Sequence, residues 1–253
     1  MKLPNYKQTV LRCSLFSLFL CMVGLGLHAD EDYLSEEELY GDFEDDSVVV
    51  NDPLQPMNRV IFKFNDFVYM NVVRHVANGY TAITPDFVEK GSSNFFHNLK
   101  YPVRLTGNLL QGRMKGAWIE TERFVVNTTL GVGGVYRAAD RFDRMQPIEP
   151  EDVGQALGAW GIGEGPFLVL PLLGPSNVRD LFGLVGDRAV NPLSEPFSVI
   201  SDWEWQLALD ATKFVTSSPD LISRYIEIRE NSIDPYSAIK SGYTEKRRSM
   251  IKN

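Results

Sequence analysis

The chain has 253 residues, of which 44% are hydrophobic and 23% charged, so it can bury a core and is too apolar for a disordered protein. Its formal net charge of −8 is concentrated near the start: ten acidic residues lie in 30–46, whereas the chain from Ser47 onward carries 22 Lys and Arg against 23 Asp and Glu. No basic face stands out against that balance, which argues against nucleic-acid binding.

The first 29 residues have the pattern of a secretory signal peptide. Lys2, Lys7 and Arg12 precede an apolar run from Cys13 to Leu27, and a small residue, Ala29, offers a cleavage site. As a helix, the run would rise roughly 22 Å at about 1.5 Å per residue, less than the ~30 Å hydrocarbon core of a bilayer. We therefore predict export with residues 1–29 as the signal peptide, and an uncleaved anchor is the alternative.

Both cysteines lie inside that segment, so a chain cleaved there would have no disulfide or thiol chemistry. Lipidation of Cys21 is a disfavoured alternative, because Leu-Phe-Leu precedes it where a bacterial lipoprotein signal has small residues. Residues 30–50 are expected to form an acidic flexible linker, with a docking arm for a basic partner as the alternative. The folded domain is expected at 51–248 and a short tail at 249–253.

From Asn51 onward, the apolar residues between the prolines recur at the three- and four-residue steps of helices. On the first predicted helix they form one stripe: Val60, Ile61, Phe64, Phe67, Val68 and Val72. Shorter helical segments are predicted at 108–111, 117–129 and 153–160.

Later helices are predicted from their starting signals. Ser176 is a candidate N-cap for the segment after it, Asp202 can cap the next helix, and a further helix is expected to start at Ser218-Pro219. The last helix is expected after Asp234-Pro235. No stretch shows sustained alternation of apolar and polar residues, so the sequence favours an all-α fold in a single domain.

The chemistry of common enzymes and metal sites is not found. His75 and His97 have no ligand residues at metal-binding spacing, and Ser176 lacks the closing glycine of a nucleophile elbow. The glycine clusters at 131–134 and 161–165 are followed by no lysine and preceded by no strand pattern, which favours tight turns over phosphate loops. We expect no catalytic residue, no metal and no cofactor, and a secreted phospholipase is disfavoured.

Residues 160–180, WGIGEGPFLVLPLLGPSNVRD, combine glycine, proline and large apolar side chains and end on an Arg-Asp pair. The prolines prevent a regular helix and the glycines allow the chain to reverse, so we predict a hydrophobic hairpin around Phe167–Leu173. The candidate site residues of this hairpin are Gly163, Gly165, Pro166, Phe167, Leu168, Leu170, Pro171, Leu173, Gly174, Arg179 and Asp180.

Five segments occur in the order expected of the MlaA (VacJ) family, which the chain resembles over roughly 52–248. They are DPLQPMNRVIFKFND (52–66), NFFHNLKYPVRLTGNLLQG (94–112), RFVVNTTLGVGG (123–134), VGQALGAWGIGEGPFLVLPLLGPSNVRDLFG (153–183) and DPYSAIKSGYTEKR (234–247). The GPFLVLPLLGP…RD block is the most distinctive of them. The sequence departs from the family pattern in its lack of a lipobox and in Tyr136-Arg137, which stands where an acidic residue commonly follows Gly-Gly.

Members of this family are typically outer-membrane lipoproteins that remove mislocalised phospholipid from the outer leaflet and pass it to a soluble periplasmic carrier. The resemblance implies a ring of amphipathic helices in the inner leaflet, on the periplasmic side, pierced by a central channel and often bound to a trimeric porin. The alternative function is a structural adaptor that stabilises porin or envelope contacts and moves no lipid.

In the ring that the resemblance implies, the hairpin would lie at the central channel. Arg179 could attract a lipid phosphate while Asp180 complements the start of the next helix, or the two charges could pair with neighbours and merely fix the hairpin. Asn127, Thr128 and Thr129 could line a polar channel wall or simply satisfy backbone groups. Arg59, near the start of the first helix, is a weaker candidate for such a contact, since a solvated surface arginine is its default interpretation.

Overall fold

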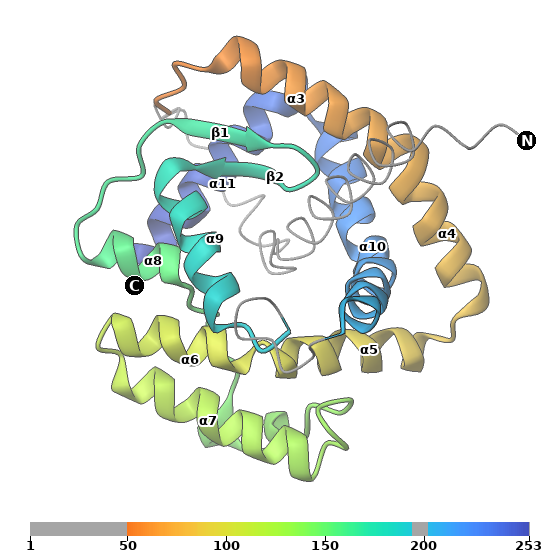
Figure 1. Ribbon diagram of the computed structural model, residues 1–253, viewed down its shortest axis with the longest axis vertical. Coiled ribbons are helices and arrows are strands. Elements are labelled where there is room, and N and C mark those ends of the chain that lie inside the picture. The colour runs from red at the N-terminus through yellow and green to blue at the C-terminus, as the bar shows by residue number, and fades with distance from the viewer. Residues whose placement is uncertain (1–49, 194–201, 253) are drawn as a thin grey trace, which may run out of the picture.

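The structure, a computed structural model, describes residues 50–193 and 202–252. The predicted signal peptide, nearly all of the predicted acidic linker and Cys21 lie outside the described residues. Most of the described chain is helical, as predicted, and the elements follow one another around a ring (Figure 1). A two-stranded hairpin lies on the inner side of the first helix, and one helix runs outside the ring.

The first arc of the ring is a continuous helical segment made of α3 (Gln55–Val68), the π-helical turn η2 (Tyr69–Val73) and α4 (Arg74–Ile83). In a plain α-helix, residues four apart drift slowly around the axis, and the wider π turn cancels that drift here. The side chains of Tyr69, Val73 and Ala77 therefore all face the same partner helix and form one buried cluster.

The second arc is α5 (Asp86–Leu99), followed by the antiparallel pair α6 (Tyr101–Leu110) and α7 (Met114–Thr129). A buried ion pair from Arg104 Nε to Glu120 Oε2 at 2.8 Å joins α6 to α7, and the stacked rings of Tyr101 and Phe124 add a second contact. Two 3₁₀ turns, η3 (Ala138–Arg141) and η4 (Asp143–Met145), lead back from α7.

The third arc contains α8 (Val153–Ala159), strands β1 (Phe167–Leu170) and β2 (Gly174–Asn177), and α9 (Val178–Val190). Helices α8 and α9 cross at two glycines: a Cβ on Gly183 would lie 2.4 Å from the Cα of Gly154. Only glycine at this crossing permits so close an approach of the two backbones.

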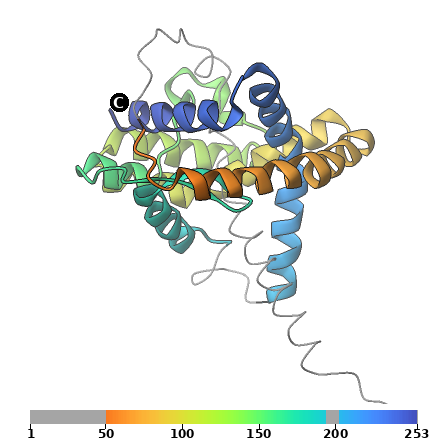
Figure 2. The same cartoon turned by 90° about the horizontal axis from the view of Figure 1, so that it is seen from above.

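The ring closes with α10 (Trp203–Asn231) and α11 (Pro235–Lys252). Figure 2 shows α10 running across the thickness of the ring, α11 lying on one side of it, and α9 together with the start of α10 extending from the other side. The predicted helix starts at Asp202 and Pro235 are confirmed, and the last helix continues through residues 249–252, which the sequence had assigned to a tail.

Two predicted helix starts are wrong. The helix predicted to begin at Ser218-Pro219 is the second half of α10, which continues through Pro219. Pro219 cannot donate to the carbonyl of Val215, but the Ser218 hydroxyl donates to that oxygen at 2.8 Å and so replaces the missing bond. The cap of α9 is Asn177 rather than Ser176, since the Asn177 side chain accepts from the backbone N–H of Asp180.

Candidate functional site

The predicted hydrophobic hairpin is a β-hairpin. Strands β1 and β2 pair antiparallel, with Phe167 opposite Asn177 and Leu170 opposite Gly174. The chain reverses through Pro171–Leu173, and positive φ angles occur at Leu172 in this turn, 64°, and at Gly174, 86°, the first residue of β2. Periodicity did not reveal the strands because β1, Phe-Leu-Val-Leu, is apolar on both of its faces.

Two asparagines of α3 hold the outer edge of this hairpin, as a further strand would. Asn58 donates to the carbonyl of Phe167 at 3.0 Å and accepts from the N–H of Val169 at 2.9 Å. Asn65 likewise donates to the carbonyl of Leu170 at 2.9 Å and accepts from the N–H of Leu172 at 2.7 Å. These backbone groups are therefore satisfied without water, a requirement for any backbone that lies at membrane depth.

The two faces of β1 have different surroundings. Phe167 and Val169 are buried and pack against Tyr236 and Tyr243 of α11. The alternate residues Leu168 and Leu170, together with Pro171 and Leu173 of the turn, are only half-buried. Of the other predicted residues, Gly163 and Gly165 lie exposed before β1, Pro166 is half-buried beside it, and Gly174 is buried in β2.

The Arg-Asp pair that ends the hairpin motif belongs to a buried ionic cluster. Arg179 donates through Nε to Asp180 Oδ1 at 2.9 Å, and both side chains are almost fully buried. Arg247 of α11 donates to Asp180 and also to Asp152, the cap of α8. The cluster therefore ties the starts of α8 and α9 to the last helix, and Arg179 pairs with its neighbour in the sequence.

Opposing effects set the ionisation of Asp180. Burial acts to raise the pKa of this carboxyl, but the charge and hydrogen bonds of Arg247, the charge of Arg179 and the hydrogen bond from the Tyr243 hydroxyl together lower it below its ordinary value. The carboxyl is consequently ionised at neutral pH. Burial and the Asp180 charge raise the pKa of the Tyr243 hydroxyl, which remains a donor.

The three residues proposed for a polar wall make bonds around α7. Asn127 is buried and its Oδ1 accepts from the backbone N–H of Ala139 at 2.9 Å, while Thr129 donates to the carbonyl of Val125. Thr128 is exposed and its hydroxyl accepts from Asn98 of α5. Two of these contacts satisfy backbone groups, which is one of the two roles predicted for these residues.

The histidines lie apart from the hairpin. His75 is exposed on α4, whereas His97 is half-buried in α5. Burial, and then the nearby charges of Arg104 and Arg137 among others, lower the pKa of His97 to about 2, so its ring is neutral. Within residues 50–193 and 202–252, no group of three His, Cys, Asp or Glu side chains could hold a metal ion.

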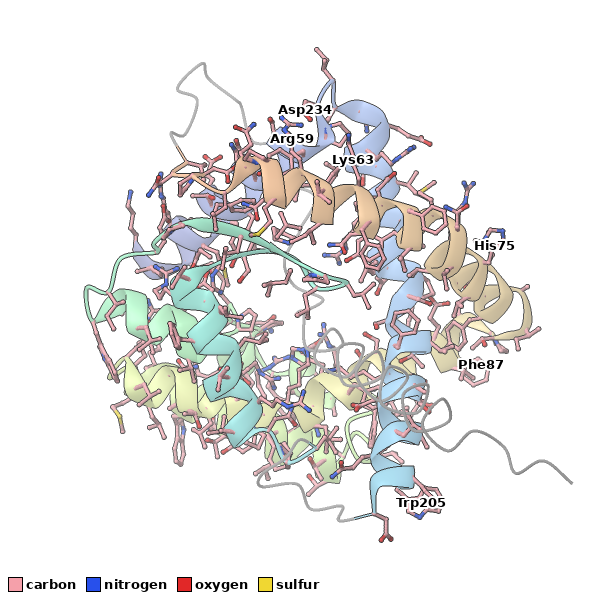
Figure 3. The ribbon with its side chains drawn as sticks, turned by 45° about the horizontal axis from the view of Figure 1, so that its top comes forward. Arg59, Lys63, His75, Phe87, Trp205 and Asp234 are labelled. Carbon is pink, nitrogen blue, oxygen red and sulfur yellow. The ribbon has the colours of Figure 1, made fainter. Side chains whose placement is uncertain are left out.

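Polar and charged side chains outnumber apolar ones among the buried residues, while large apolar side chains lie exposed around the outside. From these exposed side chains we define the apolar belt as Met57, Val60, Phe64, Phe67, Val72, Ile83, Phe87, Met114, Trp118, Val125, Leu130, Val132, Tyr136, Trp160, Ile162, Phe182, Val185 and Trp205; Leu54, Val88, Leu109, Leu110, Phe142 and Ile233 are exposed as well and are not part of it. Figure 3 shows Phe87 and Trp205 pointing away from the ring. The belt includes four of the six residues in the stripe predicted on the first helix, so that face points outward.

Sequence reasoning missed the residues that fix the hairpin from a distance: Asn58, Asn65, Asp152 and Arg247. Asn58 and Asn65 lie seven residues apart, which is one face of a helix, and this face lies opposite Val60 and Phe67 of the apolar stripe. Amide side chains on one face of the helix and apolar side chains on another are a signal that could have found them. That signal requires the apolar face to be interpreted as the one that contacts lipid. Asp152 and Arg247 are 95 residues apart, and no local pattern links them.

Comparison with known proteins agrees with this arrangement. The model of the MlaA lipoprotein family matches residues 50–250. The chain belongs to the MlaA lipoprotein family. The resemblance found in the sequence is thereby confirmed.

Several proteins are similar over most of the chain. An uncharacterized protein of Rickettsia conorii is 31% identical over 246 residues, which cover 94% of this chain and 93% of that protein. The intermembrane phospholipid transport system lipoprotein MlaA of Escherichia coli (strain K12) is 31% identical over 198 residues, covering 78% of this chain and 76% of that protein. The MlaA lipoprotein of Haemophilus influenzae is 28% identical over 198 residues, or 76% of each chain.

A solved structure has the same fold. It was solved to explain the structural basis for maintenance of bacterial outer membrane lipid asymmetry. It superposes on this chain with a TM-score of 0.67 at 28% sequence identity. The match covers 79% of this chain and 99% of that chain. The MlaA-family fold is thus a single, mostly helical domain, as the sequence predicted.

Proposed function

We propose that this protein is the outer-membrane component of an intermembrane phospholipid transport system. In this role it takes mislocalised phospholipid from the outer leaflet and passes it to a soluble periplasmic carrier. The observation that carries the proposal is the distribution of side chains: the large apolar side chains of the belt are exposed, and polar and charged side chains outnumber apolar ones among the buried residues that the structure describes. Membership of the MlaA family and the names of the E. coli and H. influenzae relatives support it.

The apolar belt suits a protein that lies in one leaflet. So many exposed large apolar side chains are unusual on a protein surrounded by water. No helix in the described part of the chain is long and apolar enough to cross a bilayer. Amphipathic helices that lie along a leaflet need no such length, and exposed tryptophans such as Trp118, Trp160 and Trp205 are typical of the interface between lipid and water.

The belt also supports an orientation. Helix α11 carries no exposed large apolar side chain among its described residues, although it lies on the surface of the ring. On the opposite side, α9 exposes Phe182 and Val185, and the start of α10 exposes Trp205. We infer that the α11 side faces the periplasm and the α9 side points into the membrane (Figure 2).

The inner side of the ring would serve the lipid. A charged headgroup cannot cross an apolar medium without compensation, because an unpaired ion is very costly to bury. Polar side chains inside the ring would lower that barrier, and the half-buried Leu168 and Leu170 of the hairpin offer a surface to acyl chains. We propose that the central channel passes beside the hairpin, and that Arg179 acts there through Asp180 rather than on the lipid directly.

The test is the amount of phospholipid exposed on the outer leaflet in a strain that lacks the protein, compared with the same strain re-expressing it. The proposal expects higher exposure without the protein and a return to the parental amount on re-expression. Unchanged exposure, with the protein shown to be present in the parent, would contradict transport. Retained binding to a trimeric porin in that case would favour the structural adaptor.

A further inference from the structure

We propose that the outer edge of α3 and α4 binds the anionic headgroups of the leaflet in which the protein lies. The residues are Lys63, Arg74 and His75, and the partner is a phospholipid surface that contains phosphatidylglycerol or a lipid of similar charge. The inference rests on the proposed function, since it takes the membrane position of the apolar belt as given, and it adds the class of lipid that this edge prefers.

The charge of this segment is unbalanced. Residues 55–83 contain three Lys and Arg residues but a single acidic residue, Asp66. That carboxylate already accepts from the Tyr225 hydroxyl and from Arg229 Nε, each at 2.8 Å. Arg59 is paired with Asp234 of the turn before α11. Lys63 and Arg74 are left without a counter-ion in the part of the chain that the structure describes.

The position of these cations on the helix favours a headgroup contact. Around the α3 axis, Asn58 and Asn65 face the hairpin, and Arg59 and Asp66 face α10 and α11. Lys63 comes next toward the outside, before the apolar belt begins. Figure 3 shows Arg59, paired with Asp234, and Lys63 farther along α3, with His75 on the outer side of α4.

The depth of the neighbouring apolar side chains fixes the depth of the cations. Phe67 is 62% exposed and lies four residues from Lys63, a rise of about 6 Å along the helix. If Phe67 lies among acyl chains, the Lys63 ammonium on its flexible stem reaches the headgroup layer and cannot reach far into bulk water. Cations on the flank of an apolar helix face are the pattern of helices that select anionic bilayers.

A merely solvated charged face would show a different arrangement. Charges of both signs would be interspersed there, as on most protein surfaces, whereas the acidic side chains beside this edge, Asp66 and Asp234, are already bound by other residues. A cation near an anionic lipid surface gains binding that amounts to about a fivefold change in partition for each charge. Removing two charges should therefore change partition about 25-fold.

The experiment measures partition of the purified full chain into vesicles of phosphatidylcholine, alone or mixed with phosphatidylglycerol, after dilution from mild detergent. The variant is Lys63→Gln with Arg74→Gln, and the control is Arg141→Gln with Lys252→Gln, which removes two exposed cations from η3 and α11. Glutamine keeps the helix propensity and removes only the charge. Circular dichroism checks that all three proteins are equally helical.

We expect phosphatidylglycerol to increase the partition of the parent and of the control into vesicles. The partition of the variant into vesicles with phosphatidylglycerol should be about 25-fold lower than that of the parent, whereas its partition into neutral vesicles should equal that of the parent. An undiminished preference for phosphatidylglycerol in the variant, or an equal loss in the control, would overturn the proposal. So would a variant that keeps this preference but loses an acidic protein partner, since the edge would then be a protein interface. Failure of the parent to bind either vesicle would instead contradict the membrane position in the proposed function and remove the basis of this inference with it.

Discussion

Replacement of Arg247 by methionine should destabilise the fold more than any other single loss of a charge on α11. The Arg247 side chain is 2% exposed and makes four hydrogen bonds to the carboxylates of Asp152 and Asp180. Methionine fills a similar length of the site but leaves both carboxylates buried without this partner. Losing one member of a buried ion pair costs about 3–5 kcal/mol of unfolding free energy.

The cost should depend on pH in a defined direction. In the parent the pKa of Asp180 is lowered, so its contribution is complete above the ordinary carboxyl pKa and is lost as pH falls through the lower folded value. Without Arg247, burial becomes the dominant effect and raises the pKa of Asp180. Protonation then relieves the buried charge, so the variant should lose more stability at pH 8 than at pH 5.

Chemical unfolding in mild detergent, followed by circular dichroism at both pH values, measures this loss. Arg248→Met is the matched control, because the neighbouring Arg248 is 41% exposed and pairs with Glu164 near the surface. That change should cost less than about 1 kcal/mol. A loss for Arg247→Met no larger than the control, or one independent of pH, would refute the reading of this cluster as a buried charge network.

Three further outcomes follow from the packing. Asn65→Leu removes the partner of two hairpin backbone groups and should cost about 2–4 kcal/mol in the same unfolding assay, whereas Asn71→Leu, at an exposed site on the adjoining π turn, should cost well under 1 kcal/mol. Gly183→Ala should cost about 1–3 kcal/mol because its Cβ meets the Gly154 backbone, whereas Gly79→Ala has open space and should stabilise by about 0.5–1 kcal/mol; equal effects would contradict the close crossing. Phe67→Asp should release the protein from membranes in an extraction assay and Ile233→Asp should not, so equal release would argue against the belt.

Local signals in the sequence predicted much of the helical framework. Asp202 and Pro235 mark helix starts because a capping residue and a first-turn proline act within a few residues of themselves, although the Asp202 side chain makes no capping hydrogen bond here. The signal at Ser218-Pro219 has the same form but lies within a long helix. There the serine hydroxyl compensates the carbonyl that proline frees, and the helix continues.

The candidate site was predicted in outline but not in its contacts. The run of Pro, Gly and apolar residues indicated a hairpin at 167–173, and the structure has one. Periodicity showed that Val60, Phe64 and Phe67 share a face, but it does not say whether that face meets a core or a lipid. In this protein the buried face of α3 is the one with Asn58 and Asn65, the reverse of the arrangement in a water-soluble domain.

The amide edge of the hairpin has a consequence for assembly. An apolar strand with free backbone groups along its side is a template on which a second chain can add, and Phe167–Leu173 would otherwise offer such a template in a crowded envelope. Asn58 and Asn65 of the same chain already form hydrogen bonds with those backbone groups. Unlike a paired strand, a side-chain amide offers no new row of backbone groups to which a further strand could bind. The protein can therefore carry its most apolar segment as a β-strand without leaving that edge free for strand-to-strand aggregation.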